Sequence, residues 1–102
     1  MSTNTLVGEY FANGTLAGLP KGHFINGAFT APGRTFPSVN PATGEDLAQI
    51  SQGSAEDVDA AVRAARKAQP KWAALPGHER AKLLYAIART IQKRERFLSV
   101  LE

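Results

Sequence analysis

The stretch Asn40-Pro41-Ala42-Thr43-Gly44 decides how the first half of this chain folds. Its asparagine can form an Asx-type hydrogen bond, its proline fixes φ, and its glycine tolerates a positive φ, so the stretch predicts a turn. Thr35–Val39 before it and Leu47–Ile50 after it can both extend as strands. We therefore expect a small antiparallel sheet here, with Pro37 at an edge because proline donates no ladder hydrogen bond.

A second hairpin is predicted upstream of this turn. Asn26-Gly27 is the most favourable pair for a type I′ turn, and it separates His23-Phe24-Ile25 from Ala28-Phe29-Thr30. Residues 1–22 differ, since they are rich in glycine and have few periodic apolar positions. We expect them to form an irregular N-terminal arm.

Two helices are predicted downstream. Ser54 and Asp57 have the spacing of a capping box, which places the first helix start at Ser54 or Ala55. Asp59 and Arg63 form an i,i+4 pair on its polar face. Pro70 is expected to end this helix, because proline disfavours helical geometry in the residue before it. The apolar stripe of the helix is rich in alanine and consists of Val58, Ala61, Val62, Ala65 and Ala68.

The second helix is expected to begin near His78 and carries the clearest periodicity, with apolar residues at Leu84, Ile87, Ala88 and Ile91. Arg94-Glu95-Arg96 interrupts the pattern, which predicts either a break or a new short helix. The fold class is therefore α/β: a hairpin or small antiparallel sheet followed by two main helices. Residues 23–102 would form this unit after the arm.

Composition excludes several kinds of site. The 102 residues contain no cysteine, which excludes a disulfide framework, a thiolate metal site and a cysteine nucleophile within them. Residues 60–102 hold ten basic and three acidic side chains, against two and six in residues 1–59. Such asymmetry can indicate an anionic partner. Because the cations are spread around two helices and do not form one stripe with aromatics, we expect no nucleic-acid partner.

No targeting segment is recognisable. The start of the chain lacks a basic region followed by an apolar run, and it also lacks an Arg-rich amphipathic pattern. No stretch approaches the length needed to cross a bilayer. We expect a cytoplasmic protein with no membrane partner.

The sequence contains no pattern of residues that is typical of a catalytic site. His23 and His78 are far apart in sequence and neither has a second ligand at i,i+4. The Gly-x-Gly-x-x-Gly and P-loop patterns are missing, and no serine has a Gly-x-Ser-x-Gly context. The carboxylate pairs Glu45-Asp46 and Glu56-Asp57 are explained by capping and solvation. We therefore predict no catalytic and no cofactor-binding residue within residues 1–102.

From about Phe24 to Glu102 the sequence resembles the start of the NAD(P)-dependent aldehyde dehydrogenases. The resemblance rests on the joint order and spacing of several short pieces, each weak alone. These pieces are Phe24-Ile25-Asn26-Gly27, Asn40-Pro41-Ala42-Thr43-Gly44-Glu45, Glu56-Asp57-Val58-Asp59, Ala61-Val62, Ala64-Ala65-Arg66, Trp72, Glu79-Arg80-Ala81, Leu83-Leu84 and Leu101-Glu102. The betaine-aldehyde-dehydrogenase-like branch is similar in its spacing from Gly33 onward.

The resemblance implies an N-terminal fragment of an enzyme that oxidises an aldehyde to a carboxylic acid with NAD or NADP. This segment would belong to the cofactor-binding domain, with the rest of the enzyme chain as its partner and a homo-oligomer as the complete form. The fragment alone would be structural and inactive, and would bind no NAD or NADP. In some relatives the backbone carbonyls at the positions of Ser38 and Val39 help to hold a monovalent cation, so these two residues are the predicted metal site.

Two other classes of function stay open at the level of sequence. One is a stand-alone helical module that binds a partner protein through the alanine-rich helix and the Leu84-Ile87-Ile91 face. The other is a basic nucleic-acid binder, whose binding would weaken steeply with salt.

Overall fold

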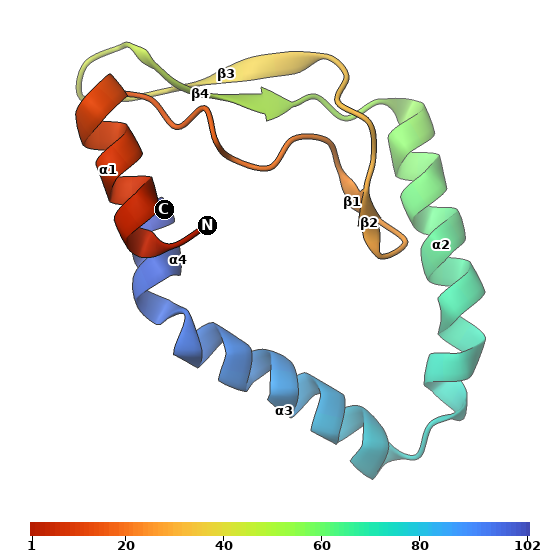
Figure 1. The fold of residues 1–102 in the computed structure, drawn as a ribbon. Coiled ribbons are helices and arrows are strands. Elements are labelled where there is room, and N and C mark those ends of the chain that lie inside the picture. The colour runs from red at the N-terminus through yellow and green to blue at the C-terminus, as the bar shows by residue number, and fades with distance from the viewer.

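The computed structural model describes residues 1–102, and the chain follows a ring-like path whose two ends meet (Figure 1). The principal extents are 49 × 33 × 21 Å, so the molecule is elongated and thin. In chain order the elements are α1 (Thr3–Asn13), β1 (Phe24–Ile25), β2 (Ala28–Phe29), β3 (Thr35–Val39), β4 (Asp46–Ser51), α2 (Ala55–Ala74), α3 (Gly77–Lys93) and α4 (Glu95–Leu101). This mixture of small antiparallel sheets and helices confirms the predicted α/β class.

The first hairpin forms as predicted. β1 pairs with β2 in antiparallel register, with Phe24 opposite Phe29. Asn26 and Gly27 both have positive φ, 54° and 81°, as a type I′ turn requires. The two phenylalanine rings meet edge to face with centroids 5.2 Å apart, which adds a cross-strand contact to a very short ladder.

β3 and β4 form a separate two-stranded sheet around the Asn40–Gly44 turn. The Asn40 side chain accepts a hydrogen bond from the Ala42 N–H at 2.9 Å, and Gly44 has a φ of 77°. The backbone N–H of Asn40 donates to the Glu45 carbonyl at 2.8 Å and closes the turn. The turn chemistry predicted from the sequence is therefore confirmed.

α2 begins where the capping box places it but does not end at Pro70. The Ser54 side chain accepts from the Asp57 N–H at 3.1 Å, and the Asp57 carboxylate accepts from the Ser54 N–H at 2.9 Å. The prediction that Pro70 ends the helix is wrong, because α2 continues to Ala74 with the proline inside it. Proline removes one N–H donor, which leaves the carbonyl of Arg66 to water, and Arg66 lies on an exposed part of the helix.

α3 and α4 meet at a short break. α3 begins at Gly77, one residue before the expected start, and ends at Lys93. Arg94 leaves helical geometry with a φ of −111° and a ψ of 16°, and α4 begins at Glu95. Of the two outcomes predicted for this region, the structure has the new short helix.

The prediction of an irregular arm over residues 1–22 is wrong for Thr3–Asn13, because these residues form the helix α1. Ser2 caps the helix by accepting a hydrogen bond from the Thr5 N–H at 3.1 Å, and Gly14 ends it with a φ of 70°. Leu6 supplies the missing stabilisation, since its side chain is only 2% exposed. The division of the chain at residues 22 and 23 stays a prediction.

The buried core is small and lies where the two ends of the chain meet. Its three buried residues are Leu6, Leu16 and Ala48. Half-buried apolar side chains from three segments pack against them, namely Leu19, Leu47, Phe97 and Leu101. α1, β4 and α4 therefore form one packed corner, while α2 and α3 contribute no buried residue. No helix has both the length and the apolar character that a bilayer crossing demands.

Candidate functional site

The predicted metal residues Ser38 and Val39 lie together at the end of β3. Ser38 faces Ala48 across the ladder and Val39 faces Asp46, with an irregularity in register between them. A bulge of this kind leaves part of the ladder unpaired and can turn a carbonyl away from the partner strand. The structure thus places both residues at a local backbone distortion, and a cation site there stays a prediction.

A hollow lined mostly by polar residues and glycines lies at the N-terminus of α2. It has a volume of about 210 Å³ and is lined by Gly22, His23, Ala31, Gly33, Arg34, Ser51, Gln52, Ser54 and Asp57. The imidazole Nε2 of His23 lies 3.5 Å from the Asp57 carboxylate and 3.3 Å from the Gln52 carbonyl. His23 therefore joins the start of the first hairpin to the start of α2.

Hydrogen bonds and charge both act on Asp57. The backbone N–H of Ser54, the Ser54 hydroxyl and the nearby His23 hold the pKa of Asp57 below its ordinary value of 3.8. The carboxylate is therefore ionised near neutral pH, which suits the positive end of the α2 dipole. Its chemistry here is that of a helix cap.

This cluster contains serine, histidine and aspartate, but their arrangement is not that of an activated nucleophile. The Ser54 hydroxyl is 2.9 Å from the Asp57 carboxylate, and no hydrogen bond joins it to His23. A nucleophilic serine needs the imidazole as its direct proton acceptor, with the carboxylate behind the imidazole. The cluster can orient a helix and bind water, and nothing in it prepares the serine for attack.

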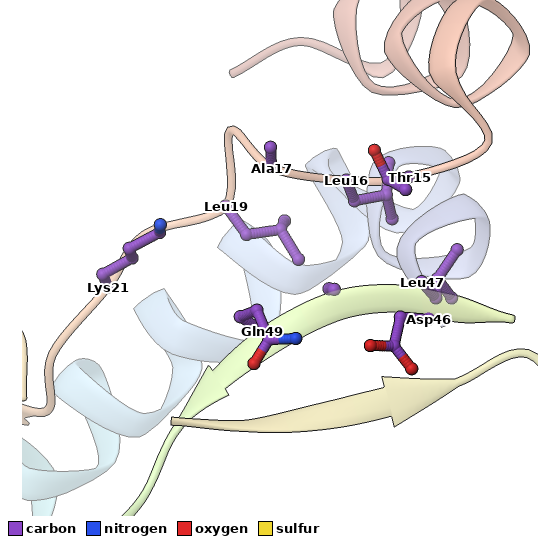
Figure 2. Close-up of a pocket in the computed structure, with 9 residues that line it drawn as sticks. Thr15, Leu16, Ala17, Leu19, Lys21, Asp46, Leu47 and Gln49 are labelled. Carbon is purple, nitrogen blue, oxygen red and sulfur yellow. The ribbon is translucent and has the colours of Figure 1, made fainter. Parts of the chain in front are cut away.

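A second hollow is apolar and runs along β4. Figure 2 shows Leu16 and Leu19, from the segment that follows α1, pointing toward the strand, and Lys21 also lines the hollow. The hollow has a volume of about 220 Å³. The Leu16 N–H donates to the Leu47 carbonyl at 2.8 Å, so the segment is fixed to β4 by backbone as well as side chain.

The other ion pairs lie on the surface and form no further site. His78 lies 3.4 Å from Glu79, its neighbour in the chain, and Lys82 lies 3.0 Å from the same carboxylate, all on the surface of α3. No group of three or more His, Cys, Asp or Glu side chains comes together to hold a metal ion. Any cation at Ser38 and Val39 would therefore depend on backbone oxygens and on ligands from elsewhere.

Two features of the structure were not predicted from the sequence, namely the contact of His23 with Asp57 and the helix that contains Leu6. The sequence prediction placed His23 at a strand start but not beside Asp57, because 34 positions separate the two residues in the printed sequence. It also left Leu6 in an irregular arm. A signal for the helix was present in Ser2 and Gly14, which have the residue types of an N-cap and a C-terminal stop.

A comparison with protein families gives a match that covers most of the chain. The model described as the aldehyde dehydrogenase family matches residues 29–102. The match includes both strands of the β3–β4 sheet and helices α2, α3 and α4. α1 and the segment that follows it lie outside the match.

Proposed function

The chain belongs to the aldehyde dehydrogenase family, and from this premise we propose that it is a structural portion of an enzyme that oxidises an aldehyde to a carboxylic acid with NAD or NADP. Residues 1–102 would supply scaffold, and the reacting groups would come from the rest of the enzyme. The resemblance implies a cysteine nucleophile for the complete enzyme, and residues 1–102 contain no cysteine, so the proposal places this nucleophile outside them.

The exposed apolar surface of α2 and α3 is the observation that carries the proposal. Leu84 and Ile87 are each 58% exposed, and Val62 and Ile91 are exposed as well. Neither helix has a buried residue along its length. Monomeric soluble proteins rarely expose apolar rows of this extent, so these faces are expected to pack against more protein.

The first test compares the product of the native gene with a purified chain of residues 1–102. The complete enzyme should have a mass well above 10.9 kDa and should reduce NAD or NADP when an aldehyde is added. The purified 102-residue chain should give no such absorbance change. Aldehyde oxidation by the short chain would overturn the structural role proposed for it.

A second test asks whether the exposed faces are covered in the complete enzyme. Ile87→Asp should lower the stability of the complete enzyme by about 2 kcal/mol or more, because a charge would enter a packed interface. The same change in the 102-residue chain should matter little, since Ile87 is exposed there. Arg89→Asp on the same helix is the control, and equal effects of the two variants would contradict a covered face.

A stand-alone protein-interaction module is the second candidate, and the same Leu84-Ile87-Ile91 face favours it. The two candidates differ in the size of the natural product. A native protein of 10.9 kDa that stays in solution would favour the module. A much larger product that reduces NAD or NADP when an aldehyde is added would favour the enzyme.

The finer features of the enzyme rest on the resemblance. We propose NAD or NADP as its cofactor, a homo-oligomer as its complete form, the cytoplasm as its location, and a betaine-aldehyde-like substrate branch. We also propose that the carbonyls of Ser38 and Val39 take part in a monovalent cation site. Their position at the register shift of β3 supports this, because a distorted ladder can present carbonyl oxygens to a hard cation.

A further inference from the structure

We infer that residues 1–19 form an exchangeable element: they can leave the packed corner of their own chain and fill the same place on a second copy. The place is a docking groove formed by Leu47 and Ala48 of β4 and by Phe97 and Leu101 of α4. In the structure the groove is occupied by Leu6, Leu16 and Leu19 of the same chain. This exchange is independent of any enzymatic role.

The contacts that hold the element are few and noncovalent. Leu6 is the only large side chain that is fully buried in the molecule. The polar contacts to the rest of the chain are the Leu16 N–H to the Leu47 carbonyl at 2.8 Å and two marginal bonds of 3.5 Å, from Asn40 to Tyr10 and from Arg94 to the Met1 carbonyl. Every one of these contacts can form equally well between two copies, which is the condition for exchange of a terminal element.

α1 needs the groove in order to fold. It has 11 residues, which is below the length at which isolated helices are stable in water, and Gly8 in its interior weakens it further. Its single charge, Glu9, is engaged by the Gly18 N–H at 2.7 Å within the element itself. The partner that fits the groove is therefore a short, nearly uncharged helix that is anchored by one buried leucine and folds as it binds.

The connection to the rest of the chain permits the exchange. Pro20, Lys21 and Gly22 separate the element from the first hairpin. Gly22 has a φ of 83° and its N–H donates to the Ser51 hydroxyl at 2.8 Å, so Gly22 stays fixed and the part of the connection that can move is Pro20 and Lys21. The groove also keeps an unfilled apolar hollow of about 390 Å³ beside α1, so the element does not complete the packing of the corner.

The experiment uses the full chain, a synthetic labelled peptide of residues 2–19, and two matched substitutions. Leu6→Asp removes the buried anchor, while Phe11→Asp places the same charge on a side chain that is 82% exposed. Hydrogen exchange of the Leu6→Asp chain should rise about 30-fold at residues 95–101 and 46–50, while residues 55–74 stay as in the unsubstituted chain. The Phe11→Asp chain should exchange like the unsubstituted one.

The peptide then supplies the missing element from outside. Added to the Leu6→Asp chain, it should bind by fluorescence anisotropy and restore protection at residues 95–101, whereas a Leu6→Asp peptide should bind about 30-fold more weakly or worse. Failure of the unsubstituted peptide to bind or protect would overturn the inference. If Leu6→Asp unfolds the whole chain, as residues 55–74 would report, Leu6→Ala replaces it and the same two outcomes decide.

Discussion

The packed corner and helices α2 and α3, together called the α2–α3 arm, have different sequence patterns, and the region with the weaker pattern is the one that is buried. In the corner, α1 is short and weakly helical, yet it buries Leu6 against β4 and α4. The arm has longer helices with regular apolar rows, and neither of these helices contains a buried residue. Apolar periodicity thus specifies a helix and the face it offers, while burial depends on a second surface being present.

Substitution of Leu6 tests this comparison most strongly. Leu6→Ala should lower the free energy of unfolding of the corner by about 2 to 4 kcal/mol, because it removes buried methyl groups and leaves a cavity. Urea denaturation or local hydrogen exchange measures the loss. Phe11→Ala on the same helix should change stability by less than about 0.5 kcal/mol, since Phe11 is exposed. Equal losses would mean that the corner is not held by Leu6.

Ser54→Ala tests how far the arm depends on its own local sequence. Loss of the capping hydroxyl should destabilise α2 by about 1 kcal/mol, seen as faster exchange in its first turn. α1 should be unaffected, because no contact joins it to this cap. An effect that spreads to α1 would show that the arm and the corner unfold together.

Acid should weaken the same cap through Asp57. Its folded pKa lies below the ordinary value of 3.8, so its stabilising effect is fully present above that pH and is lost as the pH falls through the folded pKa. Exchange at the first turn of α2, corrected for its intrinsic pH dependence, should therefore be constant near neutral pH and rise in strong acid. Asp57→Asn should remove this acid dependence; its persistence would assign the effect to another group.

The smallest change is expected on the solvated face of the arm. Asp59 and Arg63 form an ion pair of 2.8 Å, but both side chains are largely exposed. Arg63→Ala should cost no more than about 0.5 kcal/mol, and the difference should shrink as salt is added. Thermal unfolding at low and high salt measures it. A loss as large as that of Leu6→Ala would contradict the view that packing, and not surface charge, separates the two regions.

Turns and caps were predictable because each depends on a few neighbouring residues. Asn26 and Gly27 specify a type I′ turn through their tolerance of positive φ, and the Asn40–Gly44 turn closes through bonds within a few positions. The capping box of Ser54 and Asp57 is equally local. The limit of such reasoning appears at Pro70, where the cost of one lost hydrogen bond did not outweigh continuation of a long helix.

The candidate site was predictable only in part, for the same reason. Ser38 and Val39 could be placed on a strand, but the register shift between them depends on how β4 pairs. The contact of His23 with Asp57 joins two elements that the sequence leaves unrelated.

The sequence therefore specified the hairpins, the helix starts and membership of a family, since short-range hydrogen bonds and backbone preferences act within a few residues. The tertiary structure specified which apolar faces are covered. α1 is stabilised because Leu6 packs in one apolar cluster with Ala48, Phe97 and Leu101, which come from distant parts of the chain. Burial of apolar surface is non-directional and joins residues that are far apart in sequence. No local pattern could therefore have shown that α1, the helix with the weakest apolar pattern, would contribute the most buried side chain.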